Sequence, residues 1–206
     1  DWRKAAKAYR EAIALKPDEP TAYANLGAAL ANSGHYVEAA QQNLEAQERY
    51  PVGSEDWAVA TAWAFDKLQL PECNEVAKPE WWNDEGLKAL SARVVRAAPN
   101  DAEANTMRAD VLRRQCGAWG AGPRSAAELK EAAAHYERAA ALCDAPALKA
   151  ERADFAAWCL DQARELIRGS VLLELEARNE AAKVKLEEAR LKQALLSKAK
   201  LLALDG

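Results

Sequence analysis

Histidine and glycine are the first residues to consider for chemistry, and their spacing does not assemble a reactive site. The chain has 206 residues and two histidines, His35 and His135, which lie far apart in sequence. A turn histidine and a surface histidine are the simpler interpretation, because acid–base catalysis needs two groups within hydrogen-bonding reach of one substrate. Gly117, Gly120 and Gly122 form a G-x-x-G-x-G run, but no strand is expected before it, so a flexible connection is favoured over a phosphate loop. We therefore expect no catalytic residue and no enzyme activity.

Cysteine is the other candidate for chemistry. Cys73, Cys116, Cys143 and Cys159 are unevenly spaced and include no C-x2-C pair, which argues against the familiar zinc sites. Reduced thiols are the simpler interpretation, and they predict an intracellular protein in a reducing compartment, with the organelle left open. We expect no metal and no cofactor.

Charge and hydropathy narrow the class of partner. The formal net charge of −4 argues against a nucleic-acid surface, which would need a basic patch. The longest mainly apolar run, Trp57 to Phe65, is too short to span a membrane. A protein or peptide partner is the remaining expectation.

The elements that would position any site follow from a repeated pattern of aromatic, small and proline residues. The residues that carry it are Tyr23, Leu26, Gly27, Tyr36, Ala39, Ala46 and Pro51. This pattern resembles the tetratricopeptide (TPR) repeat, a helix–turn–helix of about 34 residues, and Pro17 precedes Pro51 by one such period. The resemblance implies an all-α solenoid of antiparallel helix pairs with a concave partner-binding surface.

Later prolines and glycines indicate two insertions between paired helices. Pro99 comes later than the period requires, and Pro71 and Pro79 favour an insertion at about 70–80. Glycine and proline in the CGAWGAGPRS segment favour a second insertion at about 116–125. The predicted organisation is the second helix of an incomplete TPR at 1–19, a TPR at 20–53, degenerate TPRs at 54–101 and 102–146, a capping helix at 147–168 and a long C-terminal helix at 170–204.

The C-terminal segment has a helical composition and an apolar stripe that includes Val184, Leu191 and Leu195. The stripe predicts an interface, either with the solenoid, which we favour, or with another chain. The Arg168-Gly169-Ser170 sequence marks either a natural helix break or a junction to foreign sequence.

The concave surface of TPR proteins is built mainly from the first helix of each pair, and the resemblance carries this surface over to the present chain. The predicted partner groove consists of Asn25, Ala28, Asn32, Glu55, Asp66, Asp110, Arg113 and Arg114. The two arginines could meet a carboxylate or phosphate of the partner. Their alternative role, which we favour, is to complement the helix dipole.

Tryptophans in the inserts are further candidates for partner contact. Trp119 either contacts a partner or folds back to fill its loop, whereas Trp81 and Trp82 more simply fasten a helix start to the preceding helix. Two segments, EWWNDEGLKALSARVVRAAPNDAEA and AGPRSAAELKEAAAHYERAAALC, resemble a multicopy TPR subgroup of unicellular algae, which adds no mechanism. The function expected is a protein–protein interaction scaffold without catalysis. The alternative is a structural subunit of a larger assembly, held through its inserts and C-terminal helix.

Overall fold

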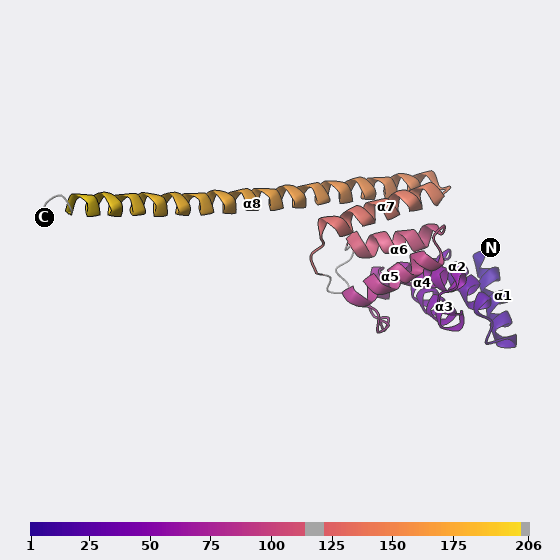
Figure 1. Ribbon diagram of the computed structural model, residues 1–206. Helices are drawn as coiled ribbons and strands as arrows, with labels where there is room; N and C mark the ends of the chain where they lie inside the picture. The colour runs from indigo at the N-terminus through magenta and orange to yellow at the C-terminus, as the bar shows by residue number, and fades with distance from the viewer. Residues whose placement is uncertain (114–121, 203–206) are drawn as a thin grey trace. The chain divides into compact units, whose positions relative to one another are not determined.

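The computed structural model describes the backbone of residues 1–113 and 122–202, and the side chains of the same residues as far as 192. This part of the chain is an all-α helical repeat and contains no strand, which confirms the predicted fold class. Figure 1 labels the eight α-helices, and a 3₁₀ helix, η1, lies between α4 and α5. The elements are α1 (Trp2–Leu15), α2 (Pro20–Ala31), α3 (Tyr36–Arg49), α4 (Glu55–Leu68), η1 (Pro71–Cys73), α5 (Asp84–Ala97), α6 (Ala102–Arg113), α7 (Ala126–Leu142) and α8 (Pro146–Leu202).

The chain divides into two compact units, and each is described by itself. The repeat unit, Asp1–Ala163, contains α1 to α7 and the first part of α8. The C-terminal unit, Arg164–Gly206, contains the rest of α8.

Short polar side chains determine where several helices begin. Ser54 accepts a hydrogen bond from the backbone N–H of Trp57 at 3.1 Å, and Asn83 accepts one from Gly86 at 2.9 Å. Ser125 forms a capping box at the start of α7. These caps satisfy N–H groups that have no partner within the helix. The helices therefore begin at positions encoded locally in the sequence.

Consecutive helices of the repeat unit pack against one another, and alanine dominates the interfaces. α1 contacts α2, α2 contacts α3, and this order continues to α7. Ala39 and Ala46 of α3 are fully buried, as are Ala58 and Ala64 of α4. Small side chains let helix backbones approach closely, so the alanine-rich composition is accounted for by helix packing.

Two first helices of successive pairs also lie next to each other. α4 contacts α6, in addition to its contacts with α3 and α5. Beyond α7, the beginning of α8 joins the stack, because Ala156 and Cys159 are buried in one cluster with Tyr136 of α7. Figure 1 shows α6, α7 and this part of α8 side by side. The start of α8 thus occupies the position of a further first helix.

The segment between α4 and α5 is held against the helix that precedes it. α5 begins at Asp84, after the Asn83 cap. Trp82 lies before the helix and packs on Phe65 of α4, with ring centroids 5.6 Å apart. Lys78 closes the segment by donating hydrogen bonds to the Leu68 and Cys73 carbonyl oxygens, at 2.9 and 2.8 Å.

The end of the chain also differs from the expectation. Separate helices at 147–168 and 170–204 were expected, but α8 is continuous from Pro146 to Leu202. Gly169 does not end the helix, because one glycine costs only about 1 kcal/mol relative to alanine and no proline follows it. The second predicted insertion, at 116–125, falls largely outside the described residues.

Candidate functional site

A cavity of about 300 Å³ lies between α2 and α4 of the repeat unit. Its walls combine small side chains with two amides and two aromatic rings. The lining residues are Thr21, Ala24, Asn25, Gly27, Ala28, Ala31, Asn43, Tyr50, Asp56, Val59, Ala60 and Trp63. The Tyr50 hydroxyl donates to Thr21 Oγ1 at 3.4 Å, which joins the end of α3 to the start of α2. The cavity is therefore suited to an extended backbone and small side chains.

A second cavity, of about 320 Å³, is lined by α4, α6, α7 and the beginning of α8. It is lined by Trp63, Asp66, Lys67, Glu103, Thr106, Asp110, Tyr136, Leu148, Glu151, Arg152 and Phe155. Trp63 lines both cavities, so the two adjoin. Together they form a track along the first helices, which we call the groove.

Acidic side chains predominate in the second cavity. Its two cations are already paired: Lys67 lies 2.5 Å from Asp66, and Arg152 lies 2.7 Å from Glu103. Two further carboxyl groups, those of Asp110 and Glu151, also line the cavity. The cavity therefore has an excess of acidic over basic side chains.

Burial raises the pKa values of two acids that line this cavity. Desolvation raises the pKa of Asp110 from 3.8 to about 6, and the nearby Asp66 carboxylate contributes in the same direction. The Tyr136 hydroxyl donates a hydrogen bond to Asp110, which partly offsets this rise in pKa. Desolvation also raises the pKa of Glu103, although Arg152 opposes the shift. Positive charge from a ligand would favour the ionised form of both acids.

Four of the predicted groove residues line these cavities. Asn25 and Ala28 lie in the first cavity, and Asp66 and Asp110 lie in the second. Because all four sit on the first helices of their pairs, the helical positions inferred from the repeat pattern bring them to the same groove.

The other predicted groove residues lie elsewhere. Asn32 caps the end of α2, and its side-chain amide donates to the Ala28 carbonyl oxygen at 2.8 Å. Glu55 is exposed in the first turn of α4. The Arg113 guanidinium lies 3.8 Å from the ring centroid of Phe155 and 5.3 Å from that of Tyr136. Arg113 thus packs α6 against α7 and α8.

The remaining candidates are partly beyond what the structure describes. Arg114 and Trp119 fall outside the described residues, and so does the side chain of Leu195. Val184 and Leu191 are exposed on the helix of the C-terminal unit.

Sequence reasoning missed Trp63 and the contribution of α8. Trp63 follows Val59 by one helical turn, and this spacing on a first helix was an available signal. Arg152 and Phe155 gave no such signal, because α8 was expected only to cover the last repeat. Its first turns extend the groove instead.

The residues singled out for chemistry are separated in the structure. His35 precedes α3, whereas His135 lies in α7, where its Nδ1 is 2.9 Å from Asn105 Oδ1. In the described part of the chain, no three His, Cys, Asp or Glu side chains are grouped to hold a metal ion. Cys73, Cys143 and Cys159 are free thiols. Among the described helices, none is long and apolar enough to cross a membrane.

Comparison with known families agrees with this architecture. Residues 1–34, which contain α1, α2 and the turn after α2, match the family model of the TPR repeat. This first segment of the chain is thus similar to a TPR repeat. TPR repeats are non-catalytic modules that generally mediate protein–protein interaction. No curated protein matches the sequence of this chain.

Proposed function

We propose that this chain is a TPR-type, non-catalytic scaffold that holds an extended segment of a partner protein in the groove. The observation that supports the proposal is the adjoining pair of cavities along α2, α4, α6 and α8, joined at Trp63. The Trp63 side chain is 37% exposed, so its ring is accessible to a ligand. Extended peptides commonly bind such grooves through main-chain hydrogen bonds and a few side-chain pockets.

The two cavities favour different parts of the partner segment. In the first, the Asn25 amide can donate to and accept from a peptide backbone. In the second, Asp66, Asp110 and Glu151 favour a lysine or arginine side chain, and Trp63 offers an aromatic face to the same cation. The partner segment would therefore carry a basic residue next to a stretch of small or polar residues.

A random peptide library displayed on phage tests the scaffold proposal, with the full chain as bait. Trp63→Ala should remove most of the peptides selected by the unchanged protein, because Trp63 contributes to both cavities. Trp2→Ala is the matched control, since Trp2 is 53% exposed on α1 and lines neither cavity. Equal selection by both variants, with both folded by circular dichroism, would contradict the proposal.

The same library tests whether the partner segment carries a basic residue. Selected peptides should be enriched in lysine and arginine, and a double variant, Asp66→Asn with Glu151→Gln, should lose that enrichment while still selecting peptides. Glu137→Gln, an exposed change on α7, serves as the control. If the unchanged protein selects peptides that are not enriched in lysine or arginine, the scaffold proposal stands. The proposed preference of the second cavity for a basic side chain is then refuted.

A further inference from the structure

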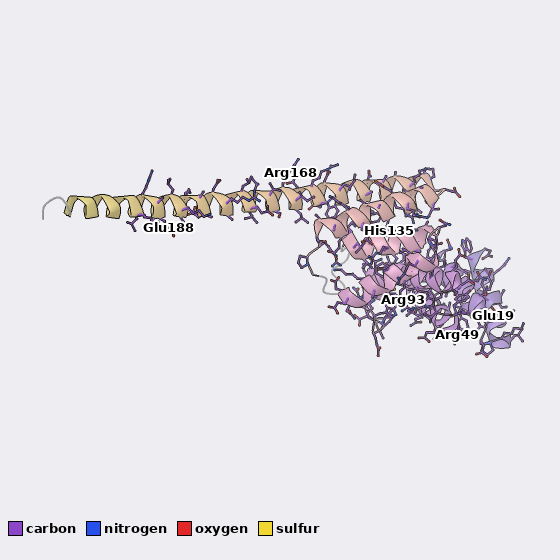
Figure 2. All side chains as sticks on the ribbon, viewed as in Figure 1. Glu19, Arg49, Arg93, His135, Arg168 and Glu188 are labelled. Carbon is purple, nitrogen blue, oxygen red and sulfur yellow. The ribbon has the colours of Figure 1, made fainter. Side chains whose placement is uncertain are left out.

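The C-terminal unit carries apolar side chains on an exposed helical face. Val184 is 52% exposed and Leu191 is 67% exposed, and Ala177 and Ala181 are exposed on the same stripe. Side chains stand out along this helix in Figure 2, where Glu188 is labelled. A single helix in water gains little stability from its own hydrogen bonds, so packing of an apolar face is the usual source of stability.

The stripe fits a coiled-coil heptad, in which apolar residues alternate at spacings of three and four. In this register Ala177, Val184 and Leu191 occupy d positions, while Ala181 and Glu188 occupy a positions. Small and apolar residues thus form most of the seam. Glu188 is a polar interruption, which lowers the stability of any pair that forms there.

The charges that flank the seam identify the partner. Glu180 and Glu187 occupy successive g positions, and Lys185 and Lys192 occupy the e positions that follow them. In a parallel pair, each g residue faces the e residue of the next heptad in the partner, so every glutamate meets a lysine. An antiparallel pair would place glutamate near glutamate and lysine near lysine. The helix is therefore complementary to a parallel copy of itself.

These side chains are free to make such contacts. In the single chain Glu180 lies 3.3 Å from Lys183, and both are more than 70% exposed. An exposed pair of this kind contributes little, so Glu180 can exchange Lys183 for a partner lysine at small cost.

We propose that the C-terminal unit pairs with the same unit of a second chain as a parallel two-stranded coiled coil. The interface consists of the seam at Ala177, Ala181, Val184 and Leu191, with glutamate–lysine pairs on either side. This dimer uses none of the residues that line the groove.

Sedimentation velocity of the full chain, from about 1 μM to about 100 μM, measures the self-association. Glu180→Lys with Glu187→Lys should weaken it by at least about tenfold, because every g-to-e contact becomes repulsive. Lys185→Glu with Lys192→Glu should do the same. An equimolar mixture of the two double variants should associate again, because the contacts between unlike chains become attractive.

A matched control separates specific pairing from net charge. Glu165→Lys with Glu176→Lys changes the charge by the same amount at positions outside the seam and its flanks, and should leave self-association unchanged. A second variant, Glu188→Leu, should tighten the association by removing the polar interruption. The proposal is overturned if Glu188→Leu remains monomeric at the highest concentration. It is equally overturned if the double variants associate like the unchanged chain, or if their mixture does not associate.

Discussion

Gly27 of α2 lies so close to Asn43 of α3 that a Cβ atom on Gly27 would be 3.0 Å from Asn43 Cγ and nearer still to its Oδ1. Asn43 is itself buried. The glycine of the repeat pattern is therefore explained by close helix approach, since α2 is regular there and requires no unusual backbone angle.

The close contact between Gly27 and Asn43 predicts the effect of adding a side chain at Gly27. Gly27→Ala should destabilise the repeat unit by about 1–3 kcal/mol, because the added methyl group must displace a buried side chain. Gly169→Ala is the control: Gly169 is also helical, and a methyl group added there would have no neighbour within 4 Å, so this change should raise helicity. Thermal unfolding followed by circular dichroism measures both. A melting temperature unchanged by Gly27→Ala would refute the packing argument.

An ion pair with a buried arginine side chain joins α5 to the segment before α7. Arg124, only 4% exposed, donates to both carboxylate oxygens of Asp84, at 3.0 and 2.6 Å, and to the Val111 carbonyl oxygen at 2.8 Å. Asp84→Asn should cost about 3 kcal/mol in urea unfolding, because it leaves a buried guanidinium without its counter-charge. Glu85→Gln, at a neighbouring exposed carboxylate, should cost little. Similar costs for the two variants would contradict this role.

The same ion pair gives a pH dependence. The hydrogen bonds from Arg124 hold the pKa of Asp84 at about 2, below its ordinary value of 3.8. The Asp84 carboxylate therefore takes up a proton less readily in the folded chain than in the unfolded chain. Its contribution to the stability of the fold is present above about pH 5 and is lost as the pH falls towards 2. Unfolding free energies measured across this range should fall less steeply for Asp84→Asn than for the unchanged chain. Identical slopes would contradict the assignment.

Asp110 and Tyr136 give the free energy of unfolding a pH dependence of opposite sign. Because burial raises the pKa of Asp110 to about 6, its contribution is favourable below about pH 4 and declines as the pH rises through 6. Tyr136→Phe should cost about 1–3 kcal/mol at pH 7.5, where the ionised carboxylate loses a donor, and less at pH 5. Tyr9→Phe on α1 is the control. Urea unfolding at the two pH values measures the difference, and an equal cost at both would refute the mechanism.

Arg113 can be tested against an arginine in an equivalent position. Both Arg96 and Arg113 lie in the last turn of their helices, but only Arg113 stacks on Phe155. Arg113→Lys should cost about 1 kcal/mol by losing the planar stack, whereas Arg96→Lys should cost almost nothing. If the two variants change the free energy of unfolding equally in chemical unfolding, the contribution of Arg113 comes from the helix dipole, which lysine also complements.

The sequence predicted the architecture better than it predicted the roles of individual residues. Gly27 and the prolines carried enough information to place the helix pairs, and so placed Asn25 and Ala28 in the groove. The role of Arg113 could not be inferred, because its aromatic partners lie in α7 and α8, distant in sequence. Gly169 was ambiguous for a different reason: a single glycine weakens a helix without deciding whether it ends.

The alanine-rich interfaces have a consequence for how the partner preference of this protein could change. Ala39, Ala46, Ala58 and Ala64 have no side-chain rotamers to rearrange, so the backbones themselves set the distance between helices. Groove residues such as Asn25 and Trp63 can then be exchanged without altering that distance. Selection could therefore diversify ligand preference at the groove while the helical framework stays constant.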